Sequence, residues 1–554
     1  MSHRRPGRTS PCRSPTRTTS RQRLRRQNPV STDEALSIRP QHPERVHLPD
    51  LAARFDLASD GDLSGRFATG VSLNSRDVRP GDLYIGMPGA RRHGAEFAAQ
   101  AAERGAVAML TDGPGARLAV GAGLPALVSP VHPREVMGDV SAAVYGTEDL
   151  DAKVFGVTGT NGKTSVVYIL AALLGAAGIT PGLSSTAERR VGDTVIPSDL
   201  TSPEASELHG LLARMREERV GGIAIEVSAQ AVVRHRLDGV RFDVVAFNNF
   251  SQDHLDEFGD LETYFAAKSR LFGPEHAERG VVVVDTPYGQ RIARESRIPV
   301  TRLATEYGAD ADWHLAVTRQ SLDGVSFVLQ GPHGAHFRGS VPLFGRFMAE
   351  NAALALIMLH EAGIPLERVA AGLTRGRIPV YIPGRLEEIT AAGESAEAGE
   401  GGSGRIRFYV DYGHTPGSFR ACLDALGEVA PGRVIFMFGA DGDRDTTKRE
   451  EMGRIAAEGS DVLIICDYHP RSEDPAAIRA QLLAGARAAG RAEVIEEADP
   501  RVAVRRAVSL AQPGDVILYA GPGHEDYQEV AGRHIPYSAR DEVRGALREA
   551  GLLP

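Results

Sequence analysis

Apolar and polar positions form three different patterns along this chain of 554 residues. Over residues 47–150, short apolar runs alternate with Pro- and Gly-containing turns and Ala-rich amphipathic stretches, which predicts a small α/β domain. Over residues 151–383, β-branched apolar runs such as GGIAIEV, DVVAFNN and RGVVVVD alternate with amphipathic segments, which predicts βαβ units around a mainly parallel sheet. Over residues 384–554, the runs IRFYVDY, RVIFMFG, DVLIICD and DVILYAG predict a second doubly wound, Rossmann-like unit. The pattern therefore predicts an α/β protein of three domains.

Two segments lack a regular pattern of apolar and polar positions. Residues 1–46 begin with an Arg- and Ser-rich stretch without an apolar core, which excludes a secretory signal and favours a disordered extension or an over-long gene start over an organellar transit peptide. We exclude this tail from the fold. The sequence TAAGESAEAGEGGSG at residues 390–404 is of low complexity, and we expect a solvated hairpin insertion without chemistry there.

Composition narrows the classes of protein. The net charge of −9 includes nine arginines and no acidic residue in the first 30 positions, so the remainder carries about −18 and is a poor surface for nucleic acid. Three cysteines without CxxC spacing indicate a reducing compartment and no metal knuckle. No apolar run is long enough for a membrane span. We therefore expect a cytoplasmic protein that binds neither nucleic acid nor membrane. We also expect a monomer, but the sequence leaves the oligomeric state open.

The strongest local motif is TGTNGKTS, between a predicted strand and the helix VVYILAALLGAAG. Small residues there let backbone N–H groups converge on phosphate oxygens, a lysine reaches the β- and γ-phosphates, and a hydroxyl coordinates Mg²⁺. Val157 stands where the usual pattern has its first glycine, so the loop is a variant. The predicted ATP-binding residues of this loop are Gly159, Thr160, Asn161, Gly162, Lys163, Thr164 and Ser165.

Lysine is scarce in the chain. Of 63 basic residues only four are lysines, at positions 153, 163, 268 and 448. An arginine can supply diffuse positive charge but cannot replace a compact, mobile ammonium or a neutral amine. Lys163 and Lys268 are therefore candidates for roles that arginine cannot fill, with chance retention as the alternative for Lys268.

Further polar residues follow the predicted strands. Glu226 ends the apolar run IAIEV, where a carboxylate suits a direct or outer-sphere Mg²⁺ role. Asn249, Asp253, His254 and Asp256 then crowd one loop ahead of the helix that bears Lys268. Such a loop serves a site more often than a core. Ligand loops of α/β sheets lie at these strand ends.

Taken in order, these motifs resemble the Mur ligases of peptidoglycan assembly, above all the UDP-N-acetylmuramoyl-tripeptide synthetases (the MurE family). The resemblance runs from about Phe67 to the C-terminus. It rests on LNSRDVRPGDLYIGMPGARRHG, TSPE, EVS, the DHLD loop, the helix lysine, GRLE, DYGHTP, GDRDTTKR and GHEDYQ, which recur in the order of the family.

The resemblance implies a role for each matching residue. Lys163, Glu226, His254 and Lys268 would form the catalytic set, and Lys268 matches a lysine that the family carries as a carbamate. The implied metal ligands are Thr164, Glu226, His254 and Lys268. The implied adenine, ribose and phosphate contacts are Asn351, Arg385, Asp411 and His414. Ser75 would contact uridine, and the muramoyl dipeptide would contact Thr201, Ser202, Ser228, Arg234 and Arg236. The implied amino-acid pocket is formed by Arg444, His469, Arg471, Gly521 and Glu525.

The implied reaction uses ATP and Mg²⁺. The γ-phosphoryl group moves to a substrate carboxylate, and the amine of an incoming amino acid attacks the acyl phosphate to give an amide, ADP and phosphate. The substrates implied are UDP-N-acetylmuramoyl-L-alanyl-D-glutamate and a diamino acid.

The chain departs from the family pattern at four places. Ala229-Gln230 replace Ser-His, Gly413 and Gly417 replace Ala and Asp, Tyr468-His469 replace Asp-Asn, and Pro522 replaces Lys. Arg471 is retained, and its planar fork suits a distal carboxylate such as that of meso-diaminopimelate. At position 469 a histidine beside that carboxylate would gain a proton, so we expect binding to strengthen toward pH 6 unless the ring only packs or faces water.

Three hypotheses of function follow. The first is an ATP-dependent ligase that adds a diamino acid, meso-diaminopimelate, to the UDP-muramoyl dipeptide. The second is a related ligase that joins a different amino acid in a natural-product pathway, which the four departures favour. The third is an inactive nucleotide-binding partner, which the intact Lys163, Glu226, His254 and Lys268 oppose. The sequence leaves the amino acid open.

Overall fold

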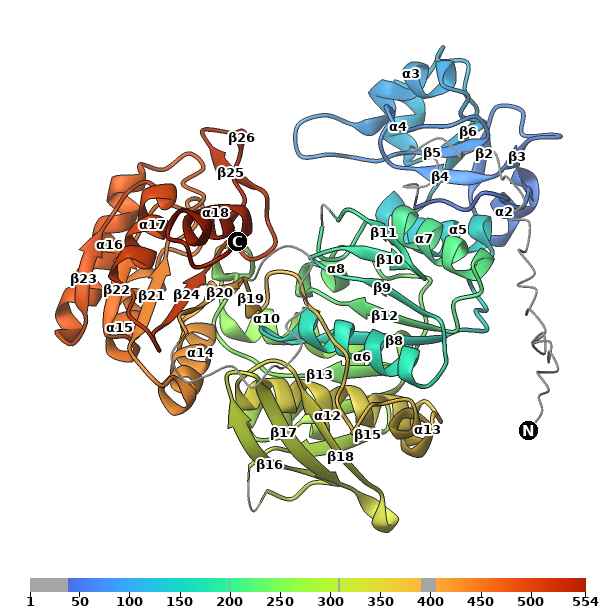
Figure 1. The fold of residues 1–554 in the computed structure, drawn as a ribbon. Helices are drawn as coiled ribbons and strands as arrows, with labels where there is room; N and C mark the ends of the chain where they lie inside the picture. Colours follow the sequence, from blue (N-terminus) through green and yellow to red (C-terminus); the bar gives the residue numbers. More distant parts are fainter. Residues whose placement is uncertain (1–37, 199, 307–308, 390–404) are drawn as a thin grey trace, which may run out of the picture. The chain divides into compact units, whose positions relative to one another are not determined.

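The computed structural model describes residues 38–554 except 199, 307–308 and 390–404 (Figure 1). The predicted hairpin insertion and the first 37 residues of the predicted tail lie outside the described residues. The end of that tail belongs to the fold, contrary to expectation. Arg39 donates hydrogen bonds of 2.9 and 2.7 Å to the buried carboxylate of Asp82, and Val46 begins a strand. A buried carboxylate requires a cationic partner, so this part of the chain is held in place.

The first unit is built on a five-stranded sheet with the order β2-β7-β6-β5-β4. Only β2 is antiparallel to its neighbour. Along β5, Leu83 and Ile85 face one apolar cluster and Tyr84 faces the other, so both sides of the sheet are covered. The strands are β1 (Val46–His47), β2 (Ala58–Asp60), β3 (Phe67–Ala68), β4 (Gly70–Ser72), β5 (Asp82–Gly86), β6 (Ala108–Thr111) and β7 (Ala126–Val128). The helices are α2 (Leu48–Arg54), η1 (Gly94–Phe97), α3 (Ala98–Glu103), α4 (Gly113–Leu118) and α5 (Pro133–Tyr145).

The middle unit contains an eleven-stranded sheet with the order β11-β10-β9-β12-β8-β13-β14-β15-β16-β17-β18. The strands are β8 (Lys153–Thr158), β9 (Pro181–Ser184), β10 (Arg189–Val191), β11 (Thr194–Ile196), β12 (Gly222–Glu226), β13 (Phe242–Phe247), β14 (Ala277–Val283), β15 (Val300–Ala304), β16 (Trp313–Ser321), β17 (Gly324–Gln330) and β18 (His336–Val341). From β9 to β16 the sheet is parallel, as expected. Antiparallel strands, which the sequence analysis did not predict, extend it at both ends.

Helices cover both faces of this sheet (Figure 1). Alternate residues of β13 show the arrangement, because Val244 packs in the cluster that contains α6 and α12 while Val245 packs in the cluster that contains α7 and α10. Burial on two faces explains the continuous apolar runs of the sequence. The helices are α6 (Lys163–Ala176), α7 (Ala205–Glu217), α8 (Ala229–Val233), α9 (Leu255–Phe258), α10 (Leu261–Ser269), η2 (Arg270–Phe272), α11 (Pro287–Glu295), η3 (Pro332–Gly334), α12 (Arg346–Glu361) and α13 (Leu366–Ala371).

The C-terminal unit has a six-stranded sheet with the order β19-β20-β24-β21-β22-β23, in which only β19 is antiparallel. The four predicted strands are β20, β21, β22 and β24. The elements are β19 (Glu387–Glu388), β20 (Arg407–Asp411), β21 (Val434–Phe438), β22 (Val462–Ile465), β23 (Glu493–Glu496), β24 (Val516–Ala520), β25 (Tyr527–Val530), β26 (Arg533–Pro536), α14 (Pro416–Val429), α15 (Arg449–Gly459), α16 (Pro475–Ala489), α17 (Pro500–Leu510) and α18 (Ala539–Glu549).

The expected fold class, an α/β protein of three domains, is confirmed, with one large sheet in each unit. Across the described residues, no helix is both long enough and apolar enough to cross a lipid bilayer.

Candidate active site

A cavity of about 740 Å³ lies at the carboxyl ends of parallel strands from two sheets. Loops after β8, β12 and β13 of the middle sheet contribute to its lining, as do loops after β20, β21 and β22 of the C-terminal sheet. Ligands of open α/β sheets bind at this edge. The cavity therefore lies where the order of the motifs predicted a site.

Most of the predicted site residues line this cavity. They are Thr160, Asn161, Gly162, Lys163, Thr164, Ser165, Thr201, Glu226, Ser228, Arg234, Arg236, His254, Asn351, Arg385, Asp411, His414, Arg444, His469, Arg471 and Glu525. Five predicted residues of the described chain do not line it, namely Ser75, Gly159, Ser202, Lys268 and Gly521. Ser75 lies in the first unit, where its hydroxyl donates to Gln100 Oε1 at 2.7 Å. Ser202 is buried and donates to the carbonyl of Glu226 at 2.9 Å.

The glycine-rich loop leads directly into α6, whose first residue is Lys163. Gly162 has φ +81°, and a Cβ there would lie 2.4 Å from Asn248 Nδ2, so only glycine fits. The ammonium of Lys163 donates to the carbonyls of Gly159 and Thr160 at 3.2 and 2.9 Å. Burial lowers the pKa of Lys163, although Glu226 and Asp253 oppose this shift. A helix N-terminus and an ammonium thus face the cavity together, which suits a phosphate.

Thr164 connects this loop to two other strand ends. Its hydroxyl donates to Glu226 Oε2 at 2.9 Å and accepts from Arg385 Nη2 at 3.1 Å. The same carboxylate oxygen accepts the backbone N–H of Thr186 at 3.0 Å. A hydroxyl and a carboxylate at this distance are the oxygen ligands that Mg²⁺ prefers.

Lys268 lies behind the loop and is 1% exposed. Its ammonium donates to the carbonyl of Gly159 at 2.8 Å and lies 4.5 Å from the ring centre of Tyr264. Burial, together with the nearby charge of Lys163, lowers the pKa of Lys268 well below its ordinary value. Such an environment favours the neutral amine that can react with CO₂.

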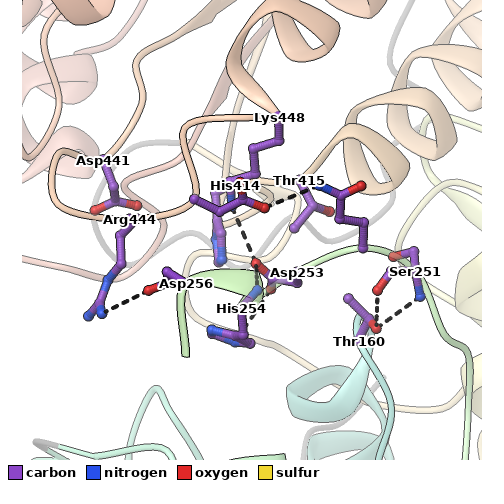
Figure 2. A network of polar contacts seen from close by, with 12 residues as sticks. Thr160, Ser251, Asp253, His254, Asp256, His414, Thr415, Asp441, Arg444 and Lys448 are labelled. Atoms are coloured by element: carbon purple, nitrogen blue, oxygen red, sulfur yellow. Dashed lines mark hydrogen bonds and ion pairs between the residues drawn. The ribbon is translucent and has the colours of Figure 1, made fainter. Parts of the chain in front are cut away.

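The loop after β13 (residues 248–254) forms hydrogen bonds to the glycine-rich nucleotide loop (residues 159–165). Asn249 Oδ1 accepts the backbone N–H of Asn161 at 2.8 Å, and Asn248 Nδ2 donates to Asn351 Oδ1 at 2.8 Å. Thr160 exchanges hydrogen bonds with the backbone of Ser251 (Figure 2). Asn248 was not among the predicted residues, although its position directly after a strand and beside Asn249 was a usable signal.

His254 follows in the same loop with φ +56°, in the left-handed region. Its backbone N–H donates to Asp253 Oδ1 at 3.0 Å. Burial lowers the pKa of His254 to about 4, against the opposing charge of Asp253. A neutral imidazole is the form that binds a metal.

A second group of polar residues lies on the middle unit next to the nucleotide loop. Ser228 caps α8 by accepting the backbone N–H of Ala231 at 3.1 Å. Arg236 forms an ion pair with Glu204 at 2.9 Å, and Arg234 pairs with Glu257. Both arginines are held by carboxylates at the edge of the cavity, where they could exchange partners with an anionic substrate.

The C-terminal unit contributes a carboxylate that is held by three donors. Glu525 accepts from Tyr412 at 3.2 Å, from Tyr468 at 2.5 Å and from His469 Nε2 at 2.7 Å. Burial opposes ionisation of Glu525, but the bonds from His469 and Tyr468 outweigh it and lower the pKa of the carboxyl. An anion is therefore fixed on the cavity wall, which suits an ammonium group.

The expected role of His469 is wrong in one respect. Its Nδ1 accepts the backbone N–H of Glu529 at 2.7 Å while its Nε2 donates to Glu525. Both ring nitrogens are used within the protein, so neither is free to bond to a substrate carboxylate. The ring therefore orients Glu525, and the expected contact between His469 and a distal carboxylate is wrong.

Arg471 reaches the cavity but has carboxylate partners already. Its guanidinium pairs with Asp441 at 3.2 Å and with Glu529 at 3.2 Å. Arg444 is half exposed and lies 3.8 Å from Asp256. The sequence analysis did not identify Asp441 or Glu529, because their proximity to Arg471 depends on how β21 and β25 are placed.

The described residues contain no group of three or more His, Cys, Asp and Glu side chains arranged to hold a metal ion. Thr164 and Glu226 nevertheless fit a cation that is also bound by phosphate oxygens, because Mg²⁺ usually takes only one or two protein carboxylates at such sites.

Three family models match the chain. The description "Mur ligase family, catalytic domain" matches residues 68–145, "Mur ligase middle domain" matches residues 157–359, and "Mur ligase, glutamate ligase domain" matches residues 398–523.

Two relatives match almost the whole chain. The UDP-N-acetylmuramyl-tripeptide synthetase of Leifsonia xyli subsp. xyli is 56% identical over 93% of this chain and 99% of its own length. The UDP-N-acetylmuramoyl-L-alanyl-D-glutamate--2,6-diaminopimelate ligase of Streptomyces coelicolor is 40% identical over 92% of this chain and 98% of its own length.

Solved structures are also similar. A UDP-N-acetylmuramoyl-L-alanyl-D-glutamate--2,6-diaminopimelate ligase superposes with a TM-score of 0.62 at 27% identity, covering 92% of this chain and 100% of the other. The MurF ligase of Thermotoga maritima in complex with ADP has a TM-score of 0.60 over 87% of this chain and 97% of its own. At 18% identity, this second likeness shows the fold alone.

Proposed function

The chain belongs to the Mur ligase family, and from this premise we propose that it joins meso-diaminopimelate to UDP-N-acetylmuramoyl-L-alanyl-D-glutamate with hydrolysis of ATP. As a member of the family it is an ATP-dependent ligase. The observation that carries the proposal is that Lys163 of the glycine-rich loop and Arg471 and Glu525 of the C-terminal unit line the same cavity. The names of several relatives, which specify 2,6-diaminopimelate, support this amino acid.

We assign the three units to three tasks. Residues 47–150 would bind the uridine end through Ser75, residues 151–383 would bind ATP, and residues 384–554 would bind the amino acid. The enzyme would act in the cytoplasm as a monomer on small-molecule substrates. The tail does not enter this assignment.

The nucleotide would lie between the two larger sheets. The N-terminus of α6 and Lys163 would hold its β- and γ-phosphates, and Asn351, Arg385, Asp411 and His414 would hold its adenosine and phosphates. Arg385 already stacks over Tyr412 at 4.2 Å and bonds to Thr164, so its charge is preset next to the phosphate site.

Thr164, Glu226, His254 and a carbamate on Lys268 would hold Mg²⁺. Bound there, the metal would supply positive charge that stabilises the transferring phosphoryl group. The buried amine of Lys268 supports this assignment, because carbamate formation requires an unprotonated amine and leaves an anionic ligand.

The remaining residues would orient the reactants. Ser228, Arg234 and Arg236 would bind the dipeptide so that its terminal carboxylate meets the γ-phosphate. The acyl phosphate that results would then be attacked by the amine of the amino acid, which Glu525 would hold in the cavity. Lys163 would offset the negative charge that develops in both steps.

Release of phosphate tests the proposal. Purified protein is given ATP, Mg²⁺ and the UDP-muramoyl dipeptide, with each of a panel of free amino acids in turn. We expect release with meso-diaminopimelate and a tripeptide product identified by mass spectrometry. No release with any amino acid would overturn the assignment and favour an inactive nucleotide-binding partner.

One observation favours a second candidate. The guanidinium of Arg471 is shared by Asp441 and Glu529, and Tyr468-His469 stand in place of Asp-Asn. Asp441, Glu525 and Glu529 place three carboxylates on this side of the cavity. They would suit a diamino acid whose side chain ends in an ammonium group and has no distal carboxylate. In the same experiment, release with L-lysine and not with meso-diaminopimelate would identify this alternative.

A further inference from the structure

Lys448 belongs to none of the roles assigned above, yet it is one of only four lysines in the chain. It lies at the end of the loop after β21, directly before the first residue of α15, and its side chain makes no capping hydrogen bond to that helix. Its side chain is 9% exposed, and its ammonium lies 3.3 Å from Asp253 Oδ1, whose side chain is also 9% exposed. Figure 2 shows it reaching from the C-terminal unit to the loop after β13.

The partner of Lys448 is also hydrogen-bonded to the backbone of a site residue. Asp253 Oδ1 accepts two hydrogen bonds, one from Lys448 and one from the backbone N–H of His254 at 3.0 Å. His254 has φ +56°, a left-handed conformation that is strained for a residue with a side chain and persists only when its surroundings impose it. The carboxylate is therefore the link between the ammonium and the geometry of His254.

Neighbouring contacts join the same two loops. Gln252 Nε2 donates to Asp445 at 3.2 Å and to Thr447 at 3.0 Å, and Arg444 lies 3.8 Å from Asp256. Only the Lys448–Asp253 pair is buried on both sides, where an ion pair is screened least. Removing Lys448 would take from the buried Asp253 carboxylate the cation that lowers its pKa most, and would leave His254, His414 and Lys163 as its charged neighbours.

We propose that Lys448 is a positioning residue of the ligase reaction, which holds the Asp253 carboxylate and through it the backbone of His254. Lysine is retained here because a compact ammonium fits the enclosed space between the two loops, whereas a guanidinium is larger and planar. The loop that ends at Lys448 also carries Arg444, a residue assigned to the amino-acid site. The same contact would therefore hold this loop and the loop that contains His254. The kinetic part of this inference rests on the proposed function.

The variant Lys448→Met removes the charge and keeps much of the length of the side chain. The matched control is Lys153→Met, because Lys153 pairs with Asp243 at 2.6 Å outside the cavity and is half exposed. We expect Lys448→Met to lower kcat for phosphate release about tenfold or more, with KM for ATP and the UDP substrate changed less than about twofold. Lys153→Met should keep the parental kcat, and both should melt within a few degrees of the parent.

A double-mutant cycle identifies the path of the effect. If Lys448 acts through Asp253, the variant Lys448→Met with Asp253→Asn should be no slower than Asp253→Asn alone. Additive losses, or full kcat in Lys448→Met, would overturn the proposal.

Hydrogen exchange provides a readout that does not depend on turnover. Amides of residues 251–256 should exchange faster in Lys448→Met than in the parent or in Lys153→Met. Unchanged exchange would overturn the positioning role even in an active enzyme. If Lys448→Met does not fold, Lys448→Gln takes its place in both measurements. A parent without ligase activity would refute the proposed function, whereas the exchange result would still decide the role of Lys448.

Discussion

Lys163 lies folded over the loop that it would serve, with its ammonium on the carbonyls of Gly159 and Thr160. These carbonyl contacts are exchangeable for phosphate oxygens, which carry far more charge. Lys163→Ala should therefore lower the rate of phosphate release by about 10²-fold or more. Steady-state assays with saturating ATP check this, and an unimpaired variant would contradict the role of the lysine.

Lys268 makes a different prediction, because its amine is buried and its pKa is lowered by burial and by Lys163. If it works as a carbamate, Lys268→Ala should be inactive in ordinary buffer and should recover in part with added acetate or formate, which can occupy the vacated anion site. Lys268→Arg should not recover, since its cation would fill that site. Full activity of Lys268→Ala, or no rescue at any carboxylate concentration, would exclude a carbamate.

Residue types and spacing located the nucleotide loop, Glu226 and His254 correctly at the cavity. They did not locate the partners that decide what a side chain does. His469 illustrates the difference, because the backbone N–H of Glu529 lies 60 positions away and fixes its tautomer. Long-range hydrogen bonds of this kind have no local signature in a sequence.

Helix α7 carries a histidine that is buried between elements of the middle and first units. His209 Nδ1 lies 2.6 Å from the hydroxyl of Thr147, and its Nε2 donates to the carbonyl of Asp238 at 2.9 Å. Burial lowers the pKa of His209 from 6.5 to about 4. The unfolded chain therefore binds a proton that the folded chain excludes over this range of pH.

The consequence is a loss of stability in acid. The contribution of neutral His209 is present in full above about pH 6.5 and is lost as the pH falls toward 4, an effect on the order of 3 kcal/mol. The thermal midpoint of the parent should thus fall between pH 7 and pH 5. His209→Asn should show a smaller fall, whereas the exposed His314→Asn should match the parent. Equal pH dependence in all three proteins would show that His209 contributes nothing.

At the scale of elements, the apolar runs predicted the central parallel strands well. Runs such as DVVAFNN are buried on both faces of the sheet, and this burial explains why they consist mostly of apolar residues. The antiparallel additions β10, β11, β17 and β18 were missed because their strands alternate with polar residues and lie at the ends of the sheet. Exposed edges leave a weaker apolar signal than covered strands.

We expect the molecule as a whole to decide which amino acid is used, because the wall that would receive it combines loops after β21, β22 and β24 and lines the same cavity as the glycine-rich loop. Arg471 is one of two arginines of this wall, with Arg444, and its guanidinium is shared by Asp441 and Glu529. A distal carboxylate on the substrate would have to displace one of these partners. The cost of that exchange is small if the substrate ammonium then takes the place of the guanidinium beside the released carboxylate.

We therefore expect meso-diaminopimelate to be preferred over L-lysine and Arg471→Ala to weaken its binding by about 2 to 5 kcal/mol, because the distal carboxylate would be left without its charged partner. Glu529→Gln should instead lower KM for meso-diaminopimelate, since it removes a competitor for the guanidinium. Arg454→Ala serves as the control, because Arg454 forms an exposed pair with Glu458 on α15. KM for both amino acids in the four proteins checks the argument. The opposite outcome is a parent that prefers L-lysine and an Arg471→Ala variant with an unchanged KM. In that case the carboxylates of the wall, and not Arg471, would bind the side chain of the substrate, which would end in an ammonium group.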